Sequence, residues 1–352
     1  MEERSLAFLK ALLDAPSASG YEQPAQRVWR EYMSQYAERV TTDMHGNCIA
    51  VLNGAGATRI LLAGHVDELG FMVNYIDDNG FIFFRTIGGF DLNLIPGRRV
   101  RIHTKNGTIP GVTGKKAIHV MTPEERKKSP EIQDLWIDIG AKDRQEAEAL
   151  VRVGDSITYV DSFEPIRGDI VASRAFDDKA GSFAVGEVLR LLQGQTFDAA
   201  VYSVSTVQEE VGLRGAHTSA YGVDPKVGIA VDVTHATDHP DMNKQRLGSV
   251  RLGAGPVIAR GANISPVVEA MLIEAAEAEG IPYQLEAAPG GTGTDANAIQ
   301  LTRAGVATGL VSIPLRYMHT AAEVLHLEDL ANVSRLLAAF IRRVKDDTDF
   351  TP

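Results

Sequence analysis

Acidic and imidazole side chains recur in this sequence directly after segments that are typical of buried strands. The five places are His65-Val66-Asp67, Asp177-Asp178, Glu209-Glu210, Asp232 and His319. In open α/β sheets, ligands collect at the carboxyl ends of the strands, so side chains in these positions can converge on one edge. Imidazole and carboxylate groups together are the ligands of zinc, cobalt or manganese. The pattern therefore indicates a divalent-metal site.

Each of these motifs also has a structural interpretation. A single histidine after a strand is commonly a hydrogen-bonded residue of the core, a Glu-Glu pair commonly lies in a solvated loop, and Asp177-Asp178 could cap the following helix. Several carboxylates buried side by side, however, repel one another strongly unless cations compensate them. The residues alone leave both interpretations open.

The elements that must position these residues alternate between helix and strand in two separate stretches. Residues 60–63 (ILLA) are apolar without alternation, as in a strand covered on both faces. Between about residues 70 and 163, short strands and tight turns such as Asp78-Asn79-Gly80 and Asn106-Gly107 predict hairpins instead. We expect a discontinuous α/β domain, residues 1–68 and 165–352, interrupted by a small all-β, barrel-like domain at residues 69–164.

Composition limits the class of protein. The 352 residues carry 35 Lys and Arg against 46 Asp and Glu, and the net charge of −11 argues against coating nucleic acid or an anionic membrane. The single cysteine, Cys48, excludes an intrachain disulfide framework and fits a reducing compartment. No apolar run reaches the roughly 18–20 residues of a membrane span, and the acidic N-terminus is unlike a secretory signal. We expect a cytoplasmic protein.

Other sequence features are less informative. Residues 291–296 match a G-x-G-x-x-A dinucleotide fingerprint, but no early βαβ unit surrounds them and no acid follows about twenty positions later. Neither a G-x-S-x-G elbow nor a phosphate loop is present. Arg316 could meet a substrate carboxylate or form a structural salt bridge. His217, His235 and His239 are interpreted as structural or cleft-lining residues.

Six segments resemble, in order and spacing, the motifs of the dinuclear metalloaminopeptidases that include the tetrahedral (TET) and glutamyl aminopeptidases. They are HVDELG, SRAFDDKAG, VQEEVGLRGA, DVTHATDHP, GTGTDANAIQL and IPLRYMHT. The similarity extends from SGYEQP near the start to the His319 region, and GGFDLNLIPGRRVRI and GTIPGVTG are similar to the second domain of that family. The resemblance implies a three-layer catalytic domain with a mixed sheet between helices, plus the inserted β domain.

The resemblance also implies a role for each site residue. His65 and Asp232 would bind one ion, Glu210 and His319 the other, and Asp177 would bridge both. We choose Asp177 over Asp178 because the family places the ligand first in this pair. Asp67 would orient the His65 ring, and Glu209 would act as the general base that takes a proton from the attacking water.

The implied activity is that of a metal-dependent aminopeptidase that removes N-terminal residues from short peptides with two divalent ions per chain, zinc or cobalt with manganese also possible. Self-association into a tetrahedral dodecamer is expected, with a dimer as the alternative, and nucleic acid and membranes are not expected partners. The insert carries KKAIHVMTPEERKKSP where relatives often have Pro-Pro-His, which leaves substrate size and oligomer geometry open. The alternatives are an N-acyl amino acid deacylase or carboxypeptidase using the same site, an endoglucanase, and a non-enzymatic scaffold.

Overall fold

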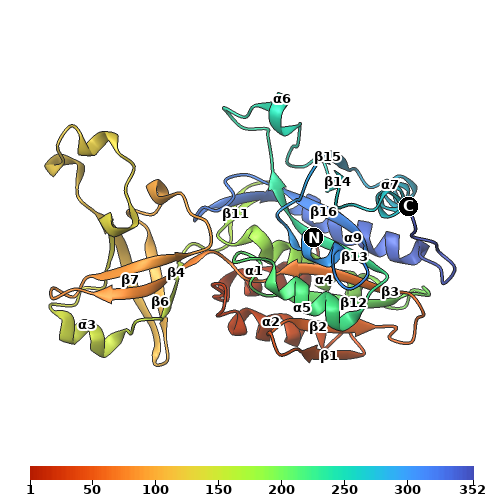
Figure 1. The fold of residues 1–352 in the computed structure, drawn as a ribbon, viewed down its shortest axis with the longest axis horizontal. Coiled ribbons are helices and arrows are strands. Elements are labelled where there is room, and N and C mark those ends of the chain that lie inside the picture. The colour runs from red at the N-terminus through yellow and green to blue at the C-terminus, as the bar shows by residue number, and fades with distance from the viewer. The chain divides into compact units, whose positions relative to one another are not determined.

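The computed structural model describes residues 1–352, and their contacts form two compact units. The first unit contains Met1–Glu68, Ser162–Met318 and Ala322–Pro352, and the second contains Leu69–Asp161 and His319–Ala321. The first unit is a mixed α/β structure and the second contains a closed barrel (Figure 1). The expected fold class, an α/β domain with a mixed sheet and an inserted β unit, is confirmed.

The first unit is built on an eight-stranded mixed sheet with the order β1-β2-β12-β3-β13-β16-β14-β15. Its strands are β1 (Arg39–Thr42), β2 (Cys48–Leu52), β3 (Arg59–His65), β12 (Ala200–Thr206), β13 (Val227–His235), β14 (Val257–Gly261), β15 (Gln284–Ala288) and β16 (Ala307–Leu315). The four central strands β12, β3, β13 and β16 are parallel. Their carboxyl ends therefore meet at one edge of the sheet.

Helices cover both faces of this sheet. They are α1 (Glu3–Asp14), α2 (Gln23–Met33), α4 (Phe176–Leu191), α5 (Arg214–Val223), α7 (Pro266–Glu279), α8 (Asp295–Gln300) and α9 (Leu327–Arg343), whereas the short α6 (Lys244–Leu247) buries no residue. One core contains buried residues of α1, α2, α4, α7 and α9, and a second core contains those of α5 and α8. In β3, Ile60 and Leu62 belong to the first core and Leu61 and Ala63 to the second, which explains its unbroken apolar run.

A small three-stranded sheet completes the first unit. It has the order β10-β11-β17 and contains β10 (Glu164–Arg167), β11 (Ile170–Ser173) and β17 (Glu323–His326). Strand β11 leads directly into the segment before α4. This sheet therefore sets the direction in which the chain enters Asp177 and Asp178.

The second unit is a six-stranded antiparallel barrel with the order β4-β5-β8-β7-β6-β9. Its elements are β4 (Gly70–Ile76), β5 (Ile82–Ile87), β6 (Arg99–Thr104), β7 (Gly107–Lys115), β8 (Leu135–Asp138), α3 (Arg144–Leu150) and β9 (Ser156–Tyr159), with short 3-10 turns at Leu92–Leu94, Ile118–Val120, Glu125–Lys127 and Ile132–Asp134. Both predicted tight turns join paired strands, β4 to β5 and β6 to β7. An aromatic cluster around Phe71 fills the interior.

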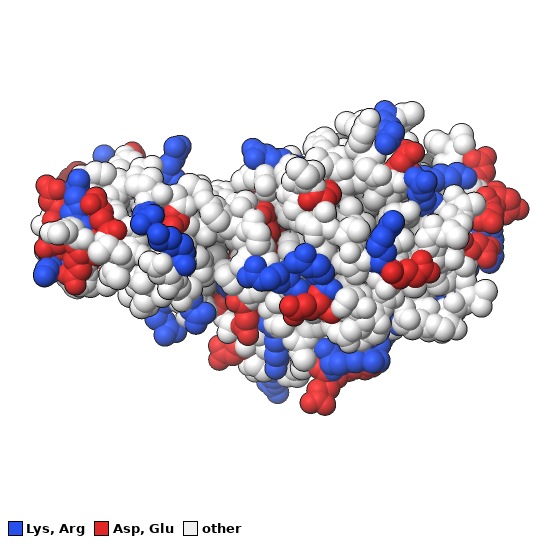
Figure 2. Space-filling view, turned by 90° about the horizontal axis from the view of Figure 1, so that it is seen from below, with Lys and Arg blue, Asp and Glu red and all other residues white.

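Charged side chains of both signs are interspersed on the face that Figure 2 shows. This mixture contrasts with the continuous basic surface that nucleic-acid binding requires. No helix in the structure combines the length and apolar character that a membrane crossing demands.

Candidate metal centre

The predicted site residues of the first unit meet at the carboxyl edge of its parallel strands. His65 ends β3, and Thr206 ends β12 in register with it. Ala230 of β13 pairs with Ala63 of β3, which brings Asp232 level with His65 two residues further on. The edge therefore gathers the ends of three neighbouring strands.

Close backbone contact brings the start of α4 to the same place. A Cβ atom on Gly64 would lie 2.4 Å from the carbonyl carbon of Gly181, so β3 and α4 touch at a point where only glycine fits. A Cβ on Gly181 would in turn lie 2.1 Å from Oδ2 of Asp178. The two glycines thus allow the aspartate pair to lie beside His65.

The imidazole of His65 is the centre of the cluster and is 2% exposed. Its Nε2 lies 3.3 Å from Oδ1 of Asp177 and 3.7 Å from Oε2 of Glu209. Its Nδ1 faces Asp67, at 3.1 Å from the backbone carbonyl oxygen and 3.4 Å from Oδ1. One ring nitrogen is therefore oriented by Asp67, while the other points toward the carboxylates.

Asp67 also anchors the loop that carries the two glutamates. Its Oδ1 accepts a hydrogen bond from the backbone N–H of Glu209 (3.0 Å), and its Oδ2 accepts one from that of Glu210 (3.2 Å) and one from the Ser19 hydroxyl (2.7 Å). A single buried carboxylate thus fixes the ring of His65 and the backbone of both glutamates.

The two neighbouring aspartates have different surroundings. Asp178 accepts hydrogen bonds from the backbone N–H groups of His65 (3.2 Å) and Gly181 (2.9 Å), so it ties β3 to α4. Asp177 instead directs Oδ1 toward Nε2 of His65. Its backbone N–H donates to Glu323 Oε2 at 3.0 Å.

Two sets of three side chains bring their ligand atoms within 4.8 Å of one another. The first is His65, Asp177 and Glu210, and the second is His65, Asp178 and Asp232. Nitrogen and carboxylate oxygen donors at this spacing suit a borderline divalent ion. The donor set in the first unit therefore fits the metal chemistry that the sequence predicts.

The electrostatics of the cluster agree with a site built for cations. Burial raises the pKa of Glu209, and nearby Asp232 and Asp295 add to this effect while His65 opposes it. Burial likewise raises the pKa of Glu210 and of Asp232. Burial alone would lower the pKa of His65, but the surrounding Glu209, Asp177 and Asp67 raise it well above its usual value. Carboxylates packed this closely remain ionised only when positive charge compensates them.

Three other residues singled out in the sequence are His319, Arg316 and Cys48. His319 belongs to the second unit with Thr320 and Ala321, and its φ of 63° lies in the left-handed region. Arg316 forms a bidentate ion pair with Asp238, with Nε to Oδ1 and Nη2 to Oδ2 at 2.8 Å each. Of the two roles considered for Arg316, the structure therefore contains the salt bridge. Cys48 is fully buried in the main core.

Sequence reasoning missed three polar residues near this edge. Ser19 bonds to Asp67. Glu22 is 4% exposed, and burial raises its pKa to about 7. Asp295 is 2% exposed, and burial raises its pKa to about 6. The signal for Asp295 was its place in the GTGTDA segment, which belongs to one of the six family motifs and also matches a dinucleotide fingerprint.

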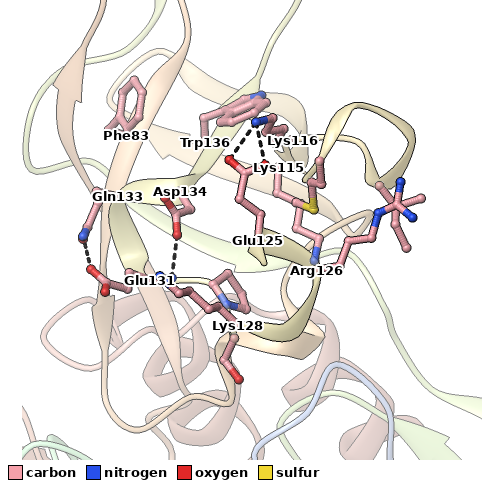
Figure 3. Close-up of a pocket in the computed structure, with 14 residues that line it drawn as sticks. Phe83, Lys115, Lys116, Glu125, Arg126, Lys128, Glu131, Gln133, Asp134 and Trp136 are labelled. Carbon is pink, nitrogen blue, oxygen red and sulfur yellow. Dashed lines mark hydrogen bonds and ion pairs between the residues drawn. The ribbon is translucent and has the colours of Figure 1, made fainter. Parts of the chain in front are cut away.

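A separate cavity of about 650 Å³ lies within the second unit (Figure 3). Residues of the segment 115–130 line much of it, together with the rings of Phe83 and Trp136. Lys116 reaches Glu125 at 2.8 Å there, and the backbone N–H of Glu131 donates to Asp134. None of the predicted ligands contributes to this cavity, so it is not the metal centre.

Comparison with known proteins identifies relatives along nearly the whole chain. The lysyl aminopeptidase of Pyrococcus furiosus is 36% identical over 353 residues, covering 98% of this chain and 99% of that protein. A TET aminopeptidase structure from a Thaumarchaeota archaeon superposes with a TM-score of 0.93 at 36% identity, covering 97% of both chains. The Pyrococcus horikoshii TET1 peptidase, described as assembling into a tetrahedron or a large octahedral shell, has a TM-score of 0.86 at 32% identity, covering 97% of this chain and 100% of that one. The model of the M42 glutamyl aminopeptidases matches residues 46–336, and this chain belongs to that family.

Proposed function

We propose that this protein is a metal-dependent aminopeptidase that cleaves N-terminal residues from short peptides with two divalent ions per chain. The observation that carries the proposal is the convergence on His65 of two carboxylate-containing donor sets, with Glu209 beside them at 3.7 Å. The lysyl specificity named for one relative is one of the side-chain preferences to be tested.

Five residues are the ligands in this proposal. His65 and Asp232 would hold one ion, Glu210 and His319 would hold the other, and Asp177 would contribute to both. Asp177 is favoured over Asp178 because its Oδ1 faces the ring of His65, whereas both oxygens of Asp178 accept backbone hydrogen bonds. Bound ions would supply Lewis-acid polarisation of the scissile carbonyl and acidify the attacking water.

Glu209 performs the proton transfers in this scheme. It has no coordination duty, it lies next to the ligand Glu210 in sequence, and Asp67 fixes its backbone. It removes a proton from the attacking water and delivers that proton to the leaving amine. Asp67 contributes by holding the tautomer of His65.

Self-association into a tetrahedral dodecamer is part of the proposal. Its support is the similarity to TET structures over nearly the whole chain, including the barrel. Light scattering on the purified protein should give a mass near twelve times 38.0 kDa. A mass of two chains would replace the dodecamer with a dimer.

The test of the activity is hydrolysis of a panel of aminoacyl-p-nitroanilides and their N-acetylated counterparts by metal-stripped protein titrated with zinc, cobalt or manganese. We expect cleavage of the free-amine substrates only, and only after metal is restored. Cleavage of the blocked substrates would move the protein to the deacylase class. No cleavage with any metal would refute the proposed reaction.

A further inference from the structure

Asp295 is a buried carboxylate at the metal edge that belongs to neither donor set. It is the first residue of α8 and is 2% exposed, the same fraction as the ligand His65. Its Oδ2 accepts a hydrogen bond from the Thr206 hydroxyl at 2.6 Å. Its Oδ1 is buried without a hydrogen-bond partner. A carboxylate in this condition is costly to maintain unless it serves the site beside it.

The position of Asp295 relative to the cluster follows from the strand register. Thr206, whose hydroxyl donates to Asp295, pairs directly with His65 across β12 and β3. The carboxylate therefore lies one strand position away from the residue on which both donor sets converge.

Thr206, its hydrogen-bond partner, is where the catalytic loop begins. Thr206 is the last residue of β12, and its carbonyl oxygen accepts from the backbone N–H of Val66, next to His65. Glu209 and Glu210 follow three and four residues later. The loop is held at successive points by side chains from elsewhere: Asn47 accepts from the Val207 N–H at 3.1 Å, and Asp67 accepts from those of Glu209 and Glu210.

Asp295 supplies the first anchor in this series, at the junction of strand and loop. Asn47 and Asp67 precede the loop in the chain, whereas Asp295, in α8, follows Thr206 by 89 residues. Loss of this anchor would remove the side-chain bond at Thr206, while the backbone bond from Val66 and the other two anchors stay in place.

We infer that Asp295 is a positioning residue, which acts through its hydrogen bond to Thr206 to place Glu209 and Glu210 for catalysis and metal binding. The inference rests on the proposed function for the role of these two glutamates. It assigns to Asp295 no contact with substrate.

The test combines Thr206→Val, Asp295→Ala, the double variant, and two conservative variants, Thr206→Ser and Asp295→Asn, which keep a donor and an acceptor. Thr206→Val and Asp295→Ala should each lower kcat about 10- to 100-fold and weaken metal binding about 10-fold, with KM within about 3-fold of the wild type. The double variant should be no worse than either single one, because both remove the same interaction. The conservative variants should stay within about 5-fold of the wild type.

Two buried residues away from the loop provide matched controls. The Thr302 hydroxyl donates to the Ala298 carbonyl at 2.9 Å. The Asp329 carboxylate accepts from the backbone N–H groups of Gly253 and Gly255 at 2.7 Å each. Thr302→Val and Asp329→Asn should leave kcat and metal affinity unchanged even where they lower the melting temperature.

The outcomes separate this inference from the proposed function. If folded Thr206→Val keeps the kcat and metal affinity of the wild type, the positioning role is overturned. An equal loss of kcat in Asp295→Asn and Asp295→Ala would also overturn it, because the charge of Asp295 would then be the important property. An increase in KM alone would also overturn it, because it would place Asp295 against the substrate. If the wild type proves inactive, the proposed function fails while the metal affinities of the same variants still decide the role of Asp295.

Discussion

Two lysine–glutamate pairs of equal length offer a direct measure of what burial does to an ion pair. Lys179 Nζ lies 2.8 Å from Glu68 Oε1, and Lys116 Nζ lies 2.8 Å from Glu125 Oε1. The side chains of the first pair are 0% and 3% exposed, whereas those of the second are 48% and 43% exposed. Replacing each lysine with methionine removes the same charge and the same contact.

We expect the two substitutions to differ severalfold in their effect on stability. Lys179 also donates to the Ala15 carbonyl at 2.6 Å, and Glu68 keeps only Arg174, at 3.1 Å, and hydrogen bonds from Ser17 after the change. Removing one partner of a buried pair costs about 3–5 kcal/mol, which at about 2 °C per kcal/mol for a large unit lowers the melting temperature by about 6–10 °C. The exposed pair contributes at most about 1 kcal/mol. It lies in the smaller second unit, where about 1 kcal/mol already shifts the melting temperature by about 4–8 °C, so the two pairs are compared by their free energies of unfolding.

Differential scanning calorimetry of zinc-saturated protein gives the change in unfolding free energy for both variants, from the melting temperature and enthalpy of the transition of each variant's own unit. Metal content must be equal in both variants, because Lys179 lies next to Asp178. Equal losses of unfolding free energy in Lys179→Met and Lys116→Met would refute the argument that burial sets the strength of the Glu68 pair.

Three further predictions address the site and the core. Glu209→Gln should lower turnover on the order of hundreds-fold with both ions retained, whereas Glu210→Gln should lose metal as well as turnover. Atomic absorption on the same samples measures the bound metal, and metal loss from Glu209→Gln would contradict its assignment as the base. Gly64→Ala should destabilise the protein by about 1–3 kcal/mol because its Cβ would collide with Gly181. Gly222→Ala, which has open space around it in α5, should stabilise the protein by about 0.5–1 kcal/mol. If urea denaturation gives changes in unfolding free energy of the same sign for both variants, the described packing at Gly64 is wrong. Cys48 should resist iodoacetamide at pH 8 in the native protein and react in urea, because burial raises its pKa to about 11; rapid native labelling, followed by mass spectrometry, would show that β2 opens.

The sequence predicted the architecture and most of the polar edge because both depend on local patterns. The apolar run at residues 60–63 indicated a doubly covered strand, and His65, Glu209 and Glu210 stood at or just after the ends of two parallel strands. The partners of these residues were not predictable in the same way. Asp295 reaches Thr206 across 89 residues, Glu68 meets Lys179 across 111, and Arg316 meets Asp238 across 78. Such pairs depend on how strands are ordered in the sheet, and neither spacing nor composition encodes that order. The same holds for Asp177 and Asp178. These neighbours point their side chains to different partners, Asp177 to the ring of His65 and Asp178 to backbone N–H groups.

The strand order also has a consequence for synthesis on the ribosome. The two neighbours of β3 in the sheet, β12 and β13, lie more than 130 residues later in the chain. The barrel, by contrast, is closed by pairing of β4 with β9, which are its first and last strands, so all six of its strands are made before β12 appears. During translation the barrel can therefore fold while RILLAGH waits as an unpaired apolar strand, and this nascent intermediate is where we expect chaperones to be needed and aggregation to begin.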